Sequence, residues 1–417
     1  MPGITTIRTL TPQAGRIDTA ALRTYDADRL ARCAADRGQP WWRRTACVDA
    51  LAGRVPPGRI GSLLACVRDT GDVAEVRRAL LGLLADREEL LPWLRHEDRR
   101  HDGAYGMTEA VLRARGALGD LTAAGELATV AFSPWQHRRT AGEAGLDALV
   151  DRHGTAAVRA ALDGDRPEDR ACVVRLRRRA DEDVTDALAD PDPRVAHLAQ
   201  SLTADPAALR GYLDRAPTAD AKLWAAYALH RLTGDTAAVR AVYEALGRPR
   251  VEVEGLDEEV RRAIVHTYGP GCEAGSDPRW RIEALCTPPP EPFDEDGQLR
   301  RAVAALAAAG LSPGPPVSCG DHHQQGGGTY HVIAYRDPDD GAGDGERGAP
   351  ATVFISTLGP FAGDYEDAPA ARAALEAAGL RWIDATAGSV RVTGLGVYHF
   401  GERGPLDVHT LLFYWQD

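Results

Sequence analysis

The chain has 417 residues, with 49 basic and 61 acidic side chains and a formal net charge of −12. Its hydrophobic fraction of 44% is normal for a globular protein with a buried core, and its length suffices for two or three domains. The acidic balance argues against general nucleic-acid binding, which normally needs a basic face.

The first 18 residues are expected to form an N-terminal extension, since they lack the apolar core of a signal sequence. The chain contains no apolar run long enough to span a membrane, so no membrane contact is predicted. The cysteines are seven, an odd number, and no Cys-x-x-Cys motif occurs. This usage favours reduced, packed thiols over a disulfide framework and predicts a cytoplasmic protein.

From residue 19 to residue 310, apolar residues recur at helical spacing in short segments that Asp, Gly and Pro interrupt. A pattern of an apolar or aromatic residue, arginine, small residues and leucine returns at intervals of roughly 30 residues, as in "WWRRTACVDAL" at residue 41 and "AEVRRALLGLL" at residue 74. Each unit is predicted to be a pair of short helices that must stack on its neighbours to bury its apolar face.

The best single unit is "VTDALADPDPRVAHLAQSL", residues 184–202, in which Asp192 is expected to cap a helix and Pro193 to occupy its first turn. Residues 220–246 carry the next clearest unit. The pattern resembles the HEAT repeat, and more closely the short HEAT-like repeat named after phycobilisome lyases. The resemblance implies an α-solenoid over residues 19–310 and says almost nothing about function, because solenoids serve many tasks.

The first unit begins with an unusual cluster, Trp41 and Trp42 followed by Arg43 and Arg44. A pair of arginines at equivalent places in several units favours a structural role over a unique site. The equivalent pairs are expected to be Arg43 and Arg44, Arg77 and Arg78, Arg138 and Arg139, and Arg261 and Arg262.

A second interpretation of this cluster stays open. The stretch "WWRRTA" looks similar to a cluster in HEAT-like alkylpurine DNA glycosylases, in which aromatic residues and a carboxylate surround a flipped-out nucleotide. Asp49 follows within two helical turns, but it matches that carboxylate poorly.

A change of pattern near residue 311 predicts a second domain. Residues 311–328 are rich in Pro and then Gly, and are expected to be a mobile linker. Residues 329–417 are expected to form a small α+β domain with a mainly antiparallel sheet. Its predicted strands are 329–336, 351–358, 389–400 and 406–415, its helix is 368–379, and 337–350 is a flexible acidic loop.

Five histidines and Cys319 fall in this last part of the chain: His322, His323, His331, His399 and His409. Imidazole and thiolate are ligands that zinc prefers, yet the spacing fits no standard zinc motif. A nucleophilic Cys–His pair is the other chemistry that these residues suggest. Neither pattern is strong enough to predict a metal, a cofactor or a catalytic residue.

The fold class is therefore mainly α: a solenoid of HEAT-like repeats followed by a small α+β domain. The expected function is a non-enzymatic binding or scaffold protein for a macromolecular partner, most simply a protein, with an immunity or inhibitor protein as one form. The alternatives are a HEAT-like DNA glycosylase or DNA-binding protein, and a tailoring or chaperone-like protein of the lyase type. The residues expected to contact the partner are Trp41, Trp42, Arg43, Arg44, Trp135, Arg138 and Trp224.

Overall fold

The computed structural model describes residues 4–95, 104–162, 164–272, 275–337, 350–364 and 368–416. The chain forms two compact units, Met1–Asp183 and Val184–Asp417. Within the described part of residues 19–310 the regular structure is helical and contains no strand, as predicted. No helix in the described segments combines the length and apolar character that a membrane crossing requires.

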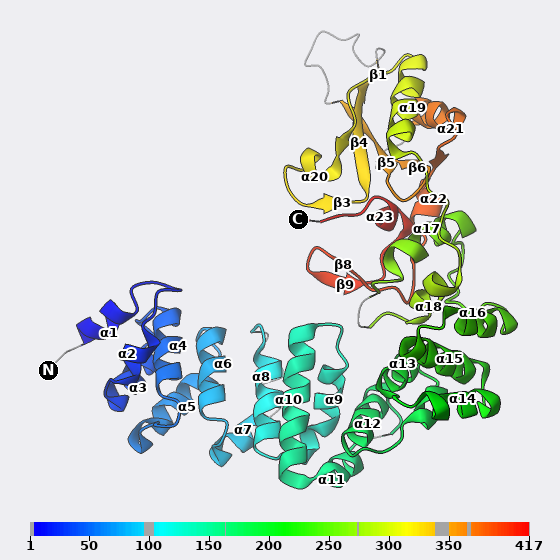
Figure 1. The fold of residues 1–417 in the computed structure, drawn as a ribbon. Helices are drawn as coiled ribbons and strands as arrows, with labels where there is room; N and C mark the ends of the chain where they lie inside the picture. Colours follow the sequence, from blue (N-terminus) through cyan, green and yellow to red (C-terminus); the bar gives the residue numbers. More distant parts are fainter. Residues whose placement is uncertain are drawn as a thin grey trace, which may run out of the picture. The chain divides into compact units, whose positions relative to one another are not determined.

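The first unit is entirely helical in its regular structure (Figure 1). Its leucine, valine and alanine side chains form two buried clusters, one in the first two thirds of the unit and one in the last third. The α-helices are α1 (Ile4–Leu10), α2 (Thr19–Arg23), α3 (Ala27–Ala35), α4 (Trp41–Ala50), α5 (Ile60–Arg68), α6 (Ala74–Leu83), α7 (Leu91–Arg95), α8 (Met107–Ala117), α9 (Ala124–Ala131), α10 (Gln136–His153), α11 (Thr155–Ala160) and α12 (Pro167–Arg179).

Two successive parts of this unit repeat the same polar contacts. Arg44 Nε donates to the carbonyl oxygen of Ala34 at 2.8 Å, and Arg77 Nε donates to that of Val67 at 2.9 Å, so both arginines reach a carbonyl ten residues earlier. The turns before α4 and α6 also correspond, since Asp36 and Asp69 each accept from a glycine N–H two residues on. The contacts therefore repeat after 33 residues.

This register corrects the predicted pairing of the arginines. Arg44 is equivalent to Arg77, whereas Arg43 has Val76 as its counterpart. Only one position of the pair points toward the preceding helix, because neighbouring residues on a helix face different directions. The predicted solenoid arrangement of the whole helical region stays a prediction.

One helix of the second unit, α13, begins with the cap that the sequence indicated. Asp192 accepts from the N–H of Arg194 at 2.8 Å, and Pro193 is the first residue of α13. The α-helices are α13 (Pro193–Leu202), α14 (Pro206–Arg215), α15 (Ala219–Thr233), α16 (Thr236–Ala245), α17 (Glu258–Tyr268), α18 (Arg279–Cys286), α19 (Glu295–Ala308), α20 (Cys319–His322), α21 (Pro369–Ala377), α22 (Ala385–Gly388) and α23 (Val408–Leu412).

A six-stranded sheet lies in the second unit, with the order β1-β4-β5-β6-β7 and with β2 also paired to β4. All of its pairs are antiparallel except β6 with β7, which confirms a mainly antiparallel sheet. Two small ribbons, β3 with β10 and β8 with β9, lie outside it. The strands are β1 (Ser312–Pro313), β2 (Val317–Ser318), β3 (Gly327–Gly328), β4 (Tyr330–Arg336), β5 (Ala351–Ser356), β6 (Phe361–Gly363), β7 (Arg381–Trp382), β8 (Val397–His399), β9 (Glu402–Gly404) and β10 (Trp415–Gln416).

Helices cover both faces of this sheet. Ile333 and Val353 point from β4 and β5 toward α19 and α21, which lie together along one flank in Figure 1. Val332 and Phe354 point the other way, into a cluster with residues of α17, α18 and α23. Neither face is left for water, and the core of the sheet draws on helices that precede residue 311.

The C-terminal segment differs from its prediction. Residues 406–415 were expected to be one strand with Phe413 and Leu412 on opposite faces, but α23 occupies 408–412 and both of these side chains are buried. Asp407 starts this helix by accepting from the N–H of Thr410 at 2.7 Å, and Val408 and Leu411 face the core one turn apart. The expected strand 389–400 contracts to β8, whose hairpin partner β9 lies where the connecting loop was predicted.

The segment expected to be a mobile linker, 311–328, contains β1, β2, α20 and β3, all paired or packed within the unit. Strands β4 and β5 and helix α21 confirm three of the predicted elements. Most of the predicted acidic loop, residues 338–349, lies outside the described residues.

Candidate functional site

The tryptophan pair at the start of α4 is partly exposed. Trp41 is 43% accessible, and its ring meets that of Trp42 edge-on with 6.1 Å between centroids. The indole N–H of Trp42 is buried and makes no hydrogen bond within the described part of the chain. Trp41 therefore offers an aromatic contact at the surface of the first unit.

The two arginines that follow are directed inward. Arg43 donates to the hydroxyl and carbonyl oxygens of Thr11 at 2.8 and 3.0 Å, and to Gln39 at 3.1 Å. Arg44 is 2% exposed and forms a bidentate pair with Asp72, both contacts at 2.6 Å. The Arg44 guanidinium holds the pKa of Asp72 below its usual value despite burial, so this pair is charged inside the protein. These guanidinium groups fix the local fold and face no ligand.

The remaining residues of the expected contact set are scattered. Trp224 is 2% exposed and packs edge-on against His197, so a partner cannot reach it in the folded chain. Trp135 is partly buried beside His137, and Arg138 forms an ion pair with Glu109 at 2.8 Å. The expected set thus divides into buried structural residues and separate surface positions, and does not form one site.

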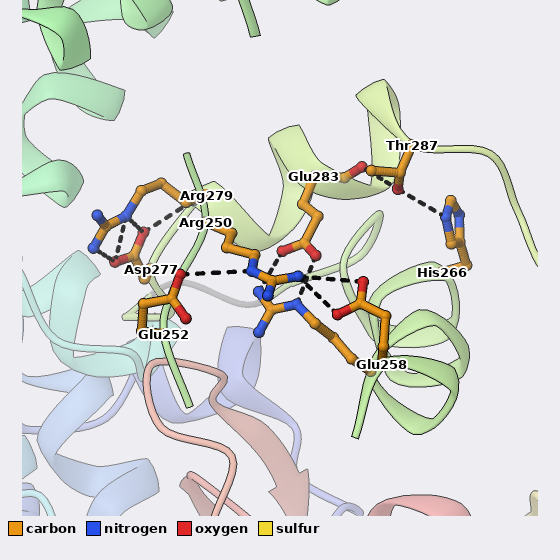
Figure 2. Close-up of polar contacts among 9 residues, drawn as sticks. Arg250, Glu252, Glu258, His266, Asp277, Arg279, Glu283 and Thr287 are labelled. Atoms are coloured by element: carbon orange, nitrogen blue, oxygen red, sulfur yellow. Dashed lines mark hydrogen bonds and ion pairs between the residues drawn. The ribbon is translucent and has the colours of Figure 1, made fainter. Parts of the chain in front are cut away.

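A dense cluster of charged side chains in the second unit is a second candidate site (Figure 2). Arg261 and Glu283 are 3% and 4% exposed and are joined by two hydrogen bonds of 2.7 and 2.6 Å. The Arg261 guanidinium also lies 4.8 Å from the ring centroid of Trp280. Figure 2 shows Arg250 reaching toward Glu258, which it meets at 2.9 Å. Opposite charges neutralise one another throughout, as in a structural ion pair that joins α17 and α18.

A run of seven aromatic and histidine side chains gathers on the surface of the second unit. His323 stacks on Trp415 with 4.1 Å between centroids, and Trp415 lies 5.0 Å from Phe400. Phe400 continues to His399 at 4.7 Å, and His399 to Tyr414 at 5.7 Å. We call this run the aromatic surface; its members are His322, His323, Tyr398, His399, Phe400, Tyr414 and Trp415.

Hydrogen bonds hold the aromatic surface in place from behind. The indole N–H of Trp415 donates to the carbonyl oxygen of Gln325 at 3.2 Å. The hydroxyl of Tyr414 donates to the backbone carbonyl oxygen of Tyr398 at 2.5 Å. His323 contacts the hydroxyl of the buried Tyr330 at 3.0 Å. The rings are therefore ordered before any partner arrives, which lowers the entropy cost of a contact.

The tip of the β8–β9 hairpin exposes a large side chain on an unfavourable backbone. His399 and Glu402 are paired, so Phe400 and Gly401 form a two-residue turn, with φ values of +42° and +86°. Positive φ at both positions is typical of a type I′ turn, which prefers Asn or Gly at the first of them. Phe400 is nevertheless there and is 47% exposed. A bulky residue held in this conformation at the surface points to a contact function.

The histidines and Cys319 do not assemble a metal centre or a nucleophile pair. His331 contacts Glu295 at 2.8 Å, and His409 contacts the carbonyl oxygen of Asp364 at 3.0 Å. Cys319 is buried at the wall of a cleft of about 570 Å³ that His331 also lines. Among the described residues, no three His, Cys, Asp or Glu side chains are grouped as a metal ion requires.

Sequence reasoning singled out three members of the aromatic surface, His322, His323 and His399, but for metal chemistry. It missed Phe400 and Trp415 because they were placed in strands, where alternation assigns one face to the core. The usable signal was the dipeptide Phe400–Gly401 between two short apolar runs, which is a hairpin turn when the glycine takes positive φ. Comparison with family models, with curated proteins and with solved structures gave no match.

Proposed function

We propose that this chain is a non-enzymatic binding protein that holds a protein partner at the aromatic surface of its second unit. The observation that carries the proposal is the ordered, partly exposed run of rings from His323 through Trp415 to Phe400. Aromatic side chains supply large contact area with few rotatable bonds, and they are enriched at the centres of protein interfaces.

The charged groups of the chain support a binding role over a catalytic one. A buried ion pair in each unit, Arg44 with Asp72 and Arg261 with Glu283, is internally neutralised and maintains helix contacts. Catalytic groups, in contrast, need a free side chain aimed at a reacting atom.

Trp41 is a second candidate contact, on the first unit. It is 43% exposed beside the unsatisfied indole N–H of Trp42, and it belonged to the contact set expected from the sequence. The arginines that would accompany it at a phosphate backbone bind Thr11 and Asp72 instead. This arrangement favours a protein contact at Trp41 over the DNA glycosylase alternative.

The test is capture of a partner by the immobilised full-length chain, comparing wild type with Phe400→Ala, Trp415→Ala and Trp41→Ala. Phe293→Ala is the matched control, because Phe293 is 37% exposed and lies outside the aromatic surface. A retained protein is then purified and its Kd is measured by calorimetry. Loss of a central aromatic contact is expected to weaken binding by about 30-fold or more.

Two results would contradict the proposal. Equal affinity of wild type, Phe400→Ala and Trp415→Ala for every purified partner would remove the aromatic surface as the contact. Excision of a base from alkylated DNA by the wild-type chain would overturn the non-enzymatic assignment.

A further inference from the structure

Resting on the proposed function, we infer that the partner presents a cationic segment, whose arginine or lysine side chains lie against the rings of the aromatic surface. The face of an aromatic ring carries partial negative charge and attracts a guanidinium or ammonium group, most strongly on tryptophan. A binding surface built from rings, with the exposed carboxylate of Glu402 at its edge, is suited to this contact.

The chain itself contains an example at this place. The guanidinium carbon of Arg403 lies over the ring of Tyr398, 5.5 Å from its centroid. This intramolecular contact has the geometry of a cation–π interaction, which needs the cation within about 6 Å of the ring centroid. A partner that supplies further cations would extend the same arrangement to Trp415 and Phe400.

The charge beside the rings favours such a partner. Asp321 is exposed next to His322, at one end of the aromatic surface. Glu402 is exposed at the hairpin tip, directly opposite His399 in the ribbon and two residues from Phe400. Desolvation, and secondly the neighbouring His322, lower the pKa of His323, which keeps that ring neutral near pH 7. A cation approaching Phe400 therefore meets the nearby Glu402 carboxylate, and one approaching Trp415 meets the neutral His323 ring stacked on it.

Other chemistries that use aromatic rings fit less well. A single-stranded nucleic acid could stack its bases on these rings, but its phosphates need a positively charged groove. The aromatic surface has Glu402 at its edge, and the one arginine described there, Arg403, is already placed over Tyr398. A nucleic acid is therefore an outcome that the test must detect and not the expected one.

The experiment measures fluorescence anisotropy of a fluorescein-labelled peptide with six alternating Gly-Arg pairs against the full-length chain. The control peptide replaces every arginine by citrulline, which has nearly the same shape and no charge. We expect the arginine peptide to bind at least about tenfold more tightly, and its affinity to fall as salt is raised.

Matched variants separate the contribution of the aromatic π face from that of apolar side-chain volume. Phe400→Leu and Trp415→Leu keep an apolar side chain but remove the π face, and each is expected to weaken the arginine peptide about two- to fivefold. Glu402→Gln should weaken it in the same direction, because it removes the neighbouring negative charge. Phe293→Leu, at an exposed ring elsewhere in the unit, should leave the affinity unchanged.

Equal binding of the arginine and citrulline peptides would overturn the inference, as would tighter binding of a labelled oligothymidylate that Trp415→Leu abolishes. The proposed function fails separately. If a purified partner loses affinity with Phe400→Ala while both peptides bind equally, the protein-binding role stands and only the cationic class is wrong. If no partner and no peptide responds to any of these variants, both are wrong.

Discussion

The arginines of this chain act as internal ties at several of their positions. Arg44 and Arg77 each reach a carbonyl oxygen on the preceding helix, and Arg44 also neutralises the buried Asp72. An isolated buried charge is costly, so each such arginine is useful only while its partner is present. The residues that hold the first unit together therefore include polar pairs as well as leucines.

Removing the partner of Arg44 should expose this dependence. Asp72→Ala leaves a buried guanidinium unpaired and is expected to lower the free energy of unfolding by about 3–5 kcal/mol. Glu376→Ala is the control, since the Arg372–Glu376 pair is exposed and should contribute less than about 1 kcal/mol. Urea unfolding of both variants measures the difference, and similar small losses would show that the Arg44–Asp72 pair is not buried in solution.

Phe400 should lower the stability of the fold while it contributes to partner binding. Phe400→Asn places a residue that tolerates positive φ at the first turn position, and is expected to raise the free energy of unfolding by about 0.5–1 kcal/mol. The same variant removes an exposed ring and should weaken partner binding. Thermal unfolding together with the peptide titration measures both effects, and a destabilised Phe400→Asn would show that the ring is needed for packing.

At the scale of the helices, α13 and α15 pack through small residues and one histidine. Ala199 and Ala225 are fully buried, as the sequence predicted. His197 of α13 lies close to the rings of Trp224 and Tyr227 of α15, with 6.1 and 6.2 Å between ring centroids. Ala199 and Ala225 have no exposed surface, so a larger side chain at either position would have to displace its neighbours.

Replacing Ala225 by Trp should overpack this contact. The substitution is expected to cost about 1–3 kcal/mol, because the buried helix face must move to admit the ring. Lys222→Trp is the control, because Lys222 is at an exposed position of the same helix, α15. Denaturant unfolding that gives equal stability for both variants would contradict the assigned helix face.

The same contact should make stability depend on pH. Burial, and secondly the positive charge of Arg281, lower the pKa of His197 from 6.5 to about 4. The unfolded chain therefore takes up a proton below pH 6.5 that the folded chain refuses until about pH 4, so stability falls as pH is lowered across this range. The loss is on the order of 3 kcal/mol.

Comparison of wild type with His197→Gln isolates this contribution. The variant cannot titrate at this position, so its stability should decline less between pH 6.5 and pH 4. His153→Gln, at an exposed histidine, serves as the control and should follow wild type. Parallel pH profiles for wild type and His197→Gln would contradict the buried, neutral state of this imidazole.

The accuracy of sequence reasoning differed between the helical and the mixed regions for a physical reason. Helical spacing and Asp caps are local signals, and they were sufficient at Asp192 and Pro193. The segment 406–415 was mistaken for a strand because Leu, Phe, Tyr and Trp suit both structures, and the cap at Asp407 was overlooked. The aromatic surface joins residues from the end of α20, from the β8–β9 hairpin and from β10, so no local pattern could have assembled it.

At the scale of the whole molecule, the chain consists of two compact units. The buried clusters of residues 7–118 and 112–176 belong to the first unit, and those of residues 251–413 and 299–380 to the second. Residues 36–44 and 69–77 share the same polar contacts, and the HEAT-like repeat stays a prediction for the helical region.

The compactness of each unit should allow it to fold separately. A fragment of residues 184–417 is expected to unfold cooperatively by itself and to bind the arginine peptide with the affinity of the full chain, because all of the aromatic surface lies within it. Calorimetry and anisotropy check the two statements. A fragment that is unfolded when isolated would show that the second unit depends on the first.

The tie from an arginine to a carbonyl ten residues earlier also has an evolutionary consequence. The acceptor is main chain, which every amino acid provides, so this bond constrains only the arginine at each junction, to which the Arg44 junction adds Asp72. The rest of the repeat can drift while the spacing of the helices persists. Distant relatives of this chain should then be found more readily by the geometry of that one bond, at Arg44 and again at Arg77, than by sequence identity.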